Sequence, residues 1–327
     1  MSSRFVLGVD IGGTKVAAGI VSGRGEVLRR ARVPMNVTGS ATQAMDCVHQ
    51  AIVQTLKKGD GMTVAEIGVS APGPLDPHTG IVLHPPNLPC WKDFQLLREI
   101  ESTYGLATRI DNDANAAGLA EALWGAGRGH DSVLYATIGT GIGTAIILHQ
   151  KLYYGRTGGA AEGGHMSIDY SGAVKCGCGK NGCIEGLAGG PAIATAAREA
   201  MAEYPQGAAA LLKLAGGKAA SVTAETVVQA WQQGDPMATR VLANATEALA
   251  VWFGNLIDLL EPEVIIVGGG LGSGISEMLG SIGERSARWS VNPRAREIPF
   301  LPAQFGVDAG IVGSAALWFR DALAQSA

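Results

Sequence analysis

A glycine- and threonine-rich turn occurs twice in this chain, each time between two short apolar runs. The first turn is Asp10-Ile-Gly12-Gly13-Thr14-Lys15, and the second is Gly139-Thr140-Gly141-Ile-Gly143. Short apolar runs are typical of buried strands, so each set predicts a strand, a tight turn and a second strand. Two copies of one motif predict a duplicated α/β fold whose related halves face each other across a cleft. The flanking runs are 5–9 and 16–21 in the first copy, and 133–138 and 144–148 in the second.

The segments after the first turn separate this chain from dinucleotide-binding proteins. A third strand is predicted over 27–33, helical spacing covers 42–57, and a further strand, 66–70, ends at a sharp turn around Gly73. The order β-β-β-α-β differs from the β-α-β-α order of a dinucleotide-binding fold. No helix follows the glycine turn, so it is not a Walker-type phosphate loop.

Both turns expose backbone N–H groups with little side-chain obstruction, which suits phosphate oxygens. In the first turn Thr14 adds a hydroxyl and Lys15 a positive charge, and Asp10 could hold Mg²⁺ directly or through water. The alternative is an ordinary hairpin turn with a surface lysine, and the spacing alone favours it. Recurrence of the turn at Thr140 and Gly141 strengthens the phosphate-binding interpretation.

Asp113 stands at a predicted strand-to-helix junction. A short strand, 107–110, runs into Asp111-Asn112-Asp113, and a helix is predicted over 114–124. An aspartate at such a place is commonly just an N-cap. The same place favours an ionised carboxylate, because peptide dipoles at a helix start stabilise negative charge. Asp113 is therefore a candidate base that accepts a proton from a substrate hydroxyl.

A proline-rich loop, 84–91, brings Asn87 close to Trp91 in the sequence. Sugars are commonly bound by amides and carboxylates beside an aromatic ring, and an amide both donates and accepts hydrogen bonds. Loops of this composition are as often plain surface cover. Asn87 is a candidate sugar contact on these grounds.

Three thiols and an imidazole are concentrated in one stretch. Glu162-Gly-Gly-His165 is followed, after a ten-residue spacer, by Cys176-Gly-Cys178-Gly-Lys-Asn-Gly-Cys183-Ile-Glu185. Four such ligands can close a tetrahedral zinc site, with the two glutamates at its edges and outside the ligand set. The chain has five cysteines, an odd number, so a metal site in a reducing compartment fits better than a disulfide framework.

The C-terminal half is predicted to be mostly helical. Helical patterns cover 188–204, 208–214 and 224–233, and a long helix begins at Asp235-Pro236 and stops at Glu261-Pro262. A buried strand, 263–267, then leads into a turn containing Gly269 and Gly270, with a helix from Ile275. Bare backbone in that turn would let a flat ring system lie against it. A last strand, 298–301, and a closing helix, 309–324, complete the pattern.

Charge and hydropathy exclude several classes of partner. With 25 basic and 29 acidic residues the net charge is -4, so no basic field points to nucleic acid or to an anionic membrane. The amino-terminal apolar run is too short for a signal peptide, and no run approaches the roughly 18 residues of a membrane span. We expect a cytoplasmic protein with a small-molecule partner.

Taken together, these motifs resemble the ROK family of bacterial sugar kinases and sugar-responsive repressors. The most specific part is the string 176–185, and the resemblance covers nearly the whole chain through 10–15, 112–115, 139–143, 162–165, 264–270 and 309–313. It implies an actin-like, ribonuclease-H-like fold of two α/β domains in which hexose and ATP meet in the cleft. We expect a small domain, 1–120 completed by 309–325, and a large domain, 121–308, with the zinc loop 162–185.

The resemblance also implies roles for individual residues, with Asp113 as catalytic base. Zinc is matched to His165, Cys176, Cys178 and Cys183, so one nitrogen of His165 is on zinc and the other ring edge faces the sugar. The implied sugar contacts are Gly73, Asn87, Asn112, Asp113, Glu162, His165 and Glu185. The implied contacts to Mg-ATP are Asp10, Gly12, Gly13, Thr14, Lys15, Thr140 and Gly141 at the phosphates, with Gly269 and Gly270 near the adenosine.

Two positions depart from the family pattern. Thr144 stands where many relatives carry a further glycine after the second turn, which affects the details of phosphate contact. Gly163 is smaller than the residue often found between the Glu and Gly of the sugar motif, which can loosen or reshape the sugar pocket.

The implied reaction is ATP- and Mg²⁺-dependent phosphorylation of the 6-hydroxyl of glucose, with zinc in a structural role. Kinases of N-acetylglucosamine or N-acetylmannosamine are the alternative, because they present the same hydroxyls to the same carboxylates. A sugar-sensing repressor is disfavoured, since family repressors carry a helix-turn-helix before the kinase-like body and the first turn here begins at residue 10. A polyphosphate-dependent kinase is disfavoured by the adenosine turn together with the zinc string. Family members are commonly homodimers or dimers of dimers.

Overall fold

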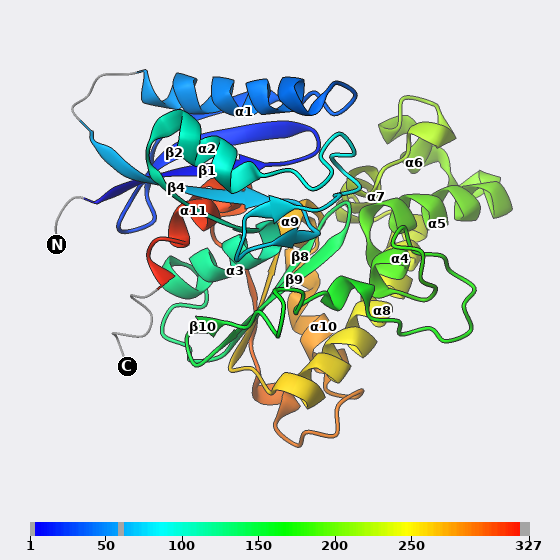
Figure 1. Ribbon diagram of the computed structural model, residues 1–327. Coiled ribbons are helices and arrows are strands. Elements are labelled where there is room, and N and C mark those ends of the chain that lie inside the picture. Colours follow the sequence, from blue (N-terminus) through cyan, green and yellow to red (C-terminus); the bar gives the residue numbers. More distant parts are fainter. Residues whose placement is uncertain (1–3, 58–61, 321–327) are drawn as a thin grey trace. The chain divides into compact units, whose positions relative to one another are not determined.

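The computed structural model of the chain describes residues 4–57 and 62–320 (Figure 1). The chain divides into two compact units. The first comprises Met1–Val133, Ala145–Ala161 and Gln304–Ala327, and the second comprises Leu134–Thr144 and Glu162–Ala303. The domain boundaries expected from the sequence, 1–120 with 309–325 and 121–308, remain predictions.

Two five-stranded sheets share one strand arrangement, which confirms the duplication predicted from the repeated turn. In the first sheet β1 (Phe5–Ile11), β2 (Lys15–Ser22), β3 (Val27–Pro34), β4 (Val64–Ala71) and β7 (Ala107–Asn112) lie in the order β3-β2-β1-β4-β7. In the second sheet β8 (Val133–Ile138), β9 (Ile142–Leu148), β10 (Lys151–Leu152), β11 (Val264–Gly268) and β12 (Phe300–Pro302) lie in the order β10-β9-β8-β11-β12. In both sheets, therefore, the two strands joined by a glycine-threonine turn are neighbours.

Helices cover the two faces of the first sheet, with α1 (Ala41–Leu56) and α2 (Leu96–Tyr104) packed into one core with it. Side chains alternate along a strand, so Leu7, Val9 and Ile11 of β1 enter that core, whereas Val6 packs with α11 (Ala309–Ala316). Figure 1 shows α1 and α11 on opposite sides of β1 and β2. The start of α1 is fixed by a capping box between Ser40 and Gln43.

Two glycines let α11 lie directly on the first sheet. A Cβ added to Gly8 would overlap the Ile311 carbonyl oxygen, and one added to Gly68 would overlap the Ser314 carbonyl oxygen. Glycine is the residue that allows backbone to approach backbone this closely. The same alternation that points Gly8 at α11 also points Asp10, two residues later, at the start of that helix.

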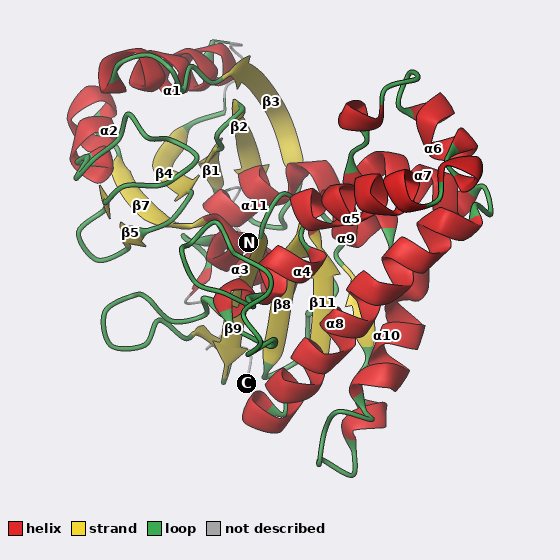
Figure 2. Ribbon diagram, turned by 90° about the vertical axis from the view of Figure 1, so that its right-hand side faces the viewer, coloured by secondary structure: helices red, strands yellow, loops and turns green. Residues whose placement is uncertain are grey.

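The second unit is mainly helical around its strands, with α4 (Ile184–Ala188), α5 (Gly190–Glu203), α6 (Ala209–Leu214), α7 (Ala224–Gln232), α8 (Pro236–Leu260), α9 (Gly269–Gly274) and α10 (Leu279–Ser286). Figure 2 shows α8 beside α5, α7 and α10. As predicted, α8 starts with an Asp235 cap, whose side chain accepts a hydrogen bond from the Ala238 N–H at 2.7 Å, and with proline in its first turn. Phe253 of α8 packs edge-on against Phe300 of β12, with ring centroids 5.1 Å apart.

Three details of the predicted helices differ in the structure. The expected helix 188–204 is α5, which begins two residues later at Gly190, and a short helix that was not predicted, α4, precedes it. The helix expected from Ile275 starts as α10 at Leu279 after a 3₁₀ turn, Ser276–Met278, and another short helix, α9, occupies the glycine-rich turn from Gly269. The closing helix α11 ends at Ala316, short of the predicted residue 324, and 321–324 lie outside the described residues. Within 4–57 and 62–320, none of the helices has the length and apolar character needed to cross a membrane.

Candidate functional site

Asp113 is the first residue of α3 (Asp113–Trp124), and its neighbour Asn112 is the N-cap. The Asn112 Oδ1 accepts hydrogen bonds from the N–H groups of Ala114 at 2.9 Å and Asn115 at 3.4 Å. The common capping role therefore belongs to Asn112. The Asp113 side chain remains exposed to solvent, with Oδ1 accepting one short hydrogen bond from the Ala114 N–H at 2.8 Å.

The surroundings of Asp113 raise its pKa to about 6. The main cause is loss of hydration, because the surrounding protein displaces water from most of the space around the carboxyl. The second cause is the negative charge of Asp10. The pKa of Asp10 is raised as well, by burial, although a hydrogen bond from Ser70 and the charges of Lys15 and Arg32 oppose that rise. Two neighbouring carboxyls with raised pKa values suit both a proton acceptor near neutral pH and a hard cation such as Mg²⁺.

Residues that were not predicted hold Asp10 in place. The Ser70 hydroxyl donates to Asp10 Oδ1 at 3.0 Å, and the Ser314 hydroxyl lies 2.9 Å from that of Ser70. Gly310 of α11 leaves room for the Asp10 carboxyl, since an added Cβ would overlap all three carboxyl atoms. Ser70 could have been predicted, because β1 and β4 pair in parallel with Asp10 opposite Ser70, and alternation then places both side chains on one face of the sheet. Gly310 and Ser314 could not, because only tertiary packing brings α11 to Asp10.

The first glycine-threonine turn lies against the predicted sugar-binding loop. The Gly12 N–H donates to the Lys15 carbonyl at 2.9 Å and closes the turn. A Cβ on Gly13 would lie 2.9 Å from the Asn87 carbonyl oxygen. Elsewhere in the same unit, a Cβ on Gly73 would lie 3.4 Å from Asn112 Nδ2. The structure thus brings Asn87 to the turn and Gly73 to Asn112.

Trp91 does not offer a ring face to a ligand. Its side chain is fully buried in the core of the first unit. It stacks on Phe94 with centroids 4.8 Å apart and an interplanar angle of 8°. The aromatic ring that made Asn87 a sugar candidate therefore has a packing role.

The second turn lies against the predicted adenosine turn. The Gly139 N–H donates to the Gly141 carbonyl at 2.9 Å. Gly269 has a φ of +82°, and a Cβ there would overlap the Ile138 carbonyl oxygen and lie 2.7 Å from the Ile138 nitrogen. Glycine is needed at Gly269 for both reasons. A Cβ added to Gly270 would meet no atom within 4 Å outside its own helix.

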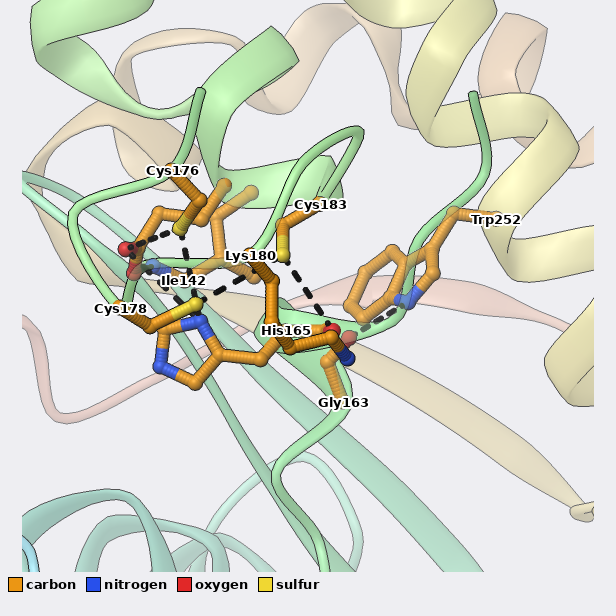
Figure 3. Close-up of polar contacts among 9 residues, drawn as sticks. Ile142, Gly163, His165, Cys176, Cys178, Lys180, Cys183 and Trp252 are labelled. Carbon is orange, nitrogen blue, oxygen red and sulfur yellow. Dashed lines mark hydrogen bonds and ion pairs between the residues drawn. The ribbon is translucent and has the colours of Figure 1, made fainter. Parts of the chain in front are cut away.

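The sugar motif is a short 3₁₀ turn, Gly163–His165, that is anchored on both sides of Gly163. The Gly163 N–H donates to Thr144 Oγ1 at 3.1 Å. The Gly163 carbonyl accepts a hydrogen bond from Trp252 Nε1 at 3.0 Å, which Figure 3 shows. A Cβ added to Gly163 would lie 2.7 Å from Thr144 Oγ1 and 3.1 Å from its Cγ2. The two positions that depart from the family pattern are thus in direct contact, and the larger residue at one fills the space left by the smaller residue at the other.

The possible metal-ligand atoms of His165, Cys176, Cys178 and Cys183 all lie within 4.8 Å of one another. Figure 3 shows these four side chains turned toward one another. The Cys178 and Cys183 sulfurs are 3.8 Å apart, and Cys176 Sγ is 3.7 Å from His165 Nδ1. A tetrahedral zinc with Zn–S bonds of about 2.3 Å separates two sulfurs by about 3.8 Å. The donor set and its spacing therefore fit zinc with four protein ligands.

The surroundings shift the pKa values of two of the thiols in opposite directions. Burial raises the pKa of Cys176. Burial also disfavours the Cys178 thiolate, but the hydrogen bonds from the Lys180 N–H and the neighbouring thiols together outweigh it, so the pKa of Cys178 is lowered. Cys178 is thus more ready than Cys176 to bind a cation as thiolate. Lys180 also donates to the His165 carbonyl at 2.7 Å, which ties the loop to the sugar motif.

Asp111, which was not predicted as a site residue, anchors the strand-to-helix junction from behind. It is 1% exposed and accepts hydrogen bonds from Tyr154 Oη at 2.6 Å, from Asn115 Nδ2 at 3.0 Å and from the Asn112 N–H at 2.8 Å. Burial raises the pKa of both Asp111 and Tyr154. Tyr154 also lines a cavity of about 530 Å³ that none of the predicted site residues lines.

The predicted residues form two groups, one in each unit. The first group is Asp10, Gly12, Gly13, Thr14, Lys15, Gly73, Asn87, Asn112 and Asp113, and the second is Thr140, Gly141, Glu162, His165, Cys176, Cys178, Cys183, Glu185, Gly269 and Gly270. Contacts within each group are described above. That the two groups form one site remains a prediction.

Residues 6–321 match the ROK family, and the chain belongs to it. Among curated relatives, it is 35% identical to a glucokinase of Streptomyces coelicolor over 96% of this chain and 97% of the relative. It is 33% identical to an N-acetylmannosamine kinase of Yersinia pseudotuberculosis over 97% of this chain and 99% of the relative. A ROK family glucokinase from Streptomyces griseus, solved with glucose and AMPPNP, superposes with a TM-score of 0.85 at 36% identity, covering 96% of this chain and 98% of that one. These matches confirm the predicted family and its actin- and hexokinase-like fold.

Proposed function

We propose that this chain transfers the γ-phosphoryl group of ATP to the 6-hydroxyl of glucose. That the chain is an ATP-dependent sugar kinase follows from the family and from the kinases it resembles over nearly its whole length. The choice of glucose is supported by the glucokinase relatives and by the Streptomyces griseus structure, which contains glucose and an ATP analogue.

Asp113 carries the proposal. Its carboxyl is exposed to solvent, is fixed by the Ala114 N–H at the start of a helix, and has a pKa raised to about 6. A base of that pKa is ionised at neutral pH and still accepts a proton readily, so it would take the hydroxyl proton as the oxygen attacks phosphorus. Asn112, whose Oδ1 is occupied by the helix cap, keeps Nδ2 for a sugar hydroxyl.

The remaining predicted residues divide between the sugar and the phosphates. Glu162, His165, Glu185, Gly73 and Asn87 would bind ring hydroxyls, and His165 would do so with Nε2, because Nδ1 faces the thiols. The two glycine-threonine turns would hold the phosphates through backbone N–H groups, which suit the charge on the phosphoryl oxygens. Mg²⁺ would be held by Asp10 and the phosphates, and when bound it neutralises part of that charge.

Zinc would be held by His165 and the three cysteines, with a structural role. Four protein ligands leave no open position for a substrate or water. Its chemistry is to fix the loop 176–183 against the sugar motif. The reaction steps belong to the chain's own residues.

A panel of hexoses with Mg-ATP, followed by ADP release, tests the function. We expect glucose to be turned over with the highest kcat/KM, and Asp113→Asn to lower kcat by about 10²–10⁴ fold. Asp46→Asn, which makes the same change at an exposed aspartate of α1 in the same unit, is the matched control and should leave kcat near the wild-type value. Near-normal turnover by Asp113→Asn, or no phosphorylation of any hexose, contradicts the proposal.

N-Acetylmannosamine is the second candidate substrate, because a kinase of that sugar is 33% identical over nearly the full length. Its N-acetyl group needs space beside the 2-position that glucose does not use. Comparison of kcat/KM for glucose, N-acetylglucosamine and N-acetylmannosamine distinguishes the two. A higher value for either amino sugar would reassign the substrate and leave the role of Asp113 unchanged.

A further inference from the structure

Glu185 links the zinc-binding cluster to the second glycine-threonine turn. It lies in the first turn of α4, two residues after the ligand Cys183. Its Oε2 accepts a hydrogen bond from the Ile142 N–H at 2.9 Å, and Ile142 is the residue that follows Gly141. The bond holds the last peptide of the turn from outside the turn itself.

The turn is shaped to receive this carboxylate. A Cβ on Gly141 would lie 2.5 Å from Glu185 Oε2, so no other residue fits there without displacing the side chain. On the other side, the Gly190 N–H donates to the Gly139 carbonyl at 2.8 Å. The segment after Cys183 therefore forms a hydrogen bond at each end of the turn, through the side chain of Glu185 and through the backbone of Gly190.

The other oxygen of Glu185 faces the metal ligands. Oε1 lies 3.5 Å from Cys176 Sγ and 4.0 Å from His165 Nδ1. Glu185 is only partly exposed, at 24% of its side chain, so the contacts on both oxygens lie largely within protein. One carboxylate thus touches the cluster with one oxygen and the phosphate turn with the other.

We propose that Glu185 is a positioning residue that couples zinc binding at the cluster to nucleotide affinity through the second glycine-threonine turn. The proposal rests on the proposed function, in which that turn holds the phosphates of ATP. A carboxylate has about four acceptor positions. The bond to Ile142 uses one of them, so Glu185 can position the turn and still bind a sugar hydroxyl.

The physical basis is the direction of the backbone N–H groups. Ile142 is 4% exposed, so its N–H has little access to water and depends on a protein acceptor. If the ligands of the cluster separate, the loop that carries Cys176 and α4 loses its fixed position and takes the acceptor with it. The turn would then present its N–H groups to phosphate in a wider range of directions, which weakens binding.

Nucleotide binding in the absence of sugar tests this coupling, because it removes the predicted sugar contact of Glu185 from the measurement. We expect the Kd for Mg-AMPPNP, measured by calorimetry, to rise about tenfold in Glu185→Ala and less in Glu185→Gln, which keeps an uncharged acceptor. Glu162→Gln is the matched control, since it removes the other carboxylate of the string and should leave this Kd within about twofold while weakening glucose binding. Gly141→Ala tests the same contact from the side of the turn, with every zinc ligand intact.

Zinc removal provides the second arm. After chelation, with zinc content verified by elemental analysis, the wild-type Kd for Mg-AMPPNP should rise. The same treatment of Glu185→Ala should add little, because the coupling residue is already absent. An unchanged Kd in Glu185→Ala and Gly141→Ala overturns the proposal, as does an equal effect of chelation in wild type and Glu185→Ala. Wild-type protein that binds no nucleotide at all would instead contradict the proposed function, and the coupling with it.

Discussion

Replacement of Gly163 by alanine tests whether Thr144 and Gly163 are matched to each other. The added Cβ would lie 2.7 Å from Thr144 Oγ1, 3.1 Å from its Cγ2 and 3.4 Å from Trp252 Cζ2, and both neighbours are buried. Overpacking of this kind costs about 1–3 kcal/mol. The backbone of Gly163 is one that alanine adopts without strain, which returns about 0.4–1 kcal/mol through the unfolded chain. We expect Gly163→Ala to lower the free energy of unfolding by about 1–2 kcal/mol.

Thr144→Ala should relieve much of this loss, because it removes both atoms that the new Cβ meets most closely. Alone, Thr144→Ala deprives the buried Gly163 N–H of its acceptor and should cost about 1–3 kcal/mol. The double variant should therefore be more stable than the sum of the two single changes predicts, by about 1 kcal/mol. Calorimetry together with urea unfolding followed by near-ultraviolet circular dichroism, which reports on Trp252, measures the coupling.

Gly164→Ala is the matched control for this cycle. A Cβ at Gly164 would overlap the carbonyl oxygen of Ile142, which is backbone and cannot be removed by a side-chain change. We expect Gly164→Ala to be more destabilising than Gly163→Ala and to gain nothing from Thr144→Ala. Strict additivity of Gly163→Ala and Thr144→Ala would refute the idea that the two residues share one space. Glucose affinity should follow the same pattern, since Gly163 positions Glu162 and His165.

Three further outcomes are expected. A pH–rate profile of kcat/KM should have an acidic midpoint near pH 6, with activity rising as pH rises, because Asp113 must be deprotonated to act as base. Asp10→Asn should move that midpoint to lower pH, because it removes a negative charge beside Asp113, and a midpoint that stays or moves upward contradicts this. Elemental analysis should find one zinc per chain in the wild type and a loss of it in Cys178→Ala, together with weaker glucose binding; full zinc content in the variant would exclude Cys178 as a ligand. Gly310→Ala should lower the melting temperature and the affinity for Mg²⁺, because the new Cβ overlaps the Asp10 carboxyl, and unchanged values for both would show that α11 does not position Asp10.

Local patterns were enough to predict the elements whose signal lies in a few neighbouring residues. Each glycine-threonine turn with its apolar flanks predicted one of the strand pairs β1–β2 and β8–β9, and the spacing of His165 and the cysteines predicted a cluster whose atoms meet. The start of α8 was readable from Asp235-Pro236, because caps act within one turn.

What the sequence did not reveal depends on contacts between distant segments. The short helix α4 was not predicted, and the first residue of α5, Gly190, donates a hydrogen bond to Gly139, about fifty positions away, which no local propensity reports. Asn87 and Trp91 are near each other in the sequence, but they do not share a role. The Trp91 ring is buried in the core, whereas the Asn87 backbone lies against Gly13 of the first glycine-threonine turn. The contact of Thr144 with Gly163 explains two departures that were separate observations in the sequence.

The seating of α11 on Gly8 and Gly68 has a consequence for synthesis on the ribosome. The first sheet is made early, but the helix that covers one of its faces, and that holds Asp10 through Gly310 and Ser314, follows β1 by nearly the whole chain. At about 5–20 residues per second, roughly 15–60 s separate translation of β1 from translation of α11. During that interval one face of the sheet is without its helix, whereas 162–303 forms one continuous stretch of the second unit and can begin to fold as it emerges. The half of the molecule that carries the proposed base is therefore expected to be the later to mature and the more dependent on chaperones in the growing cell.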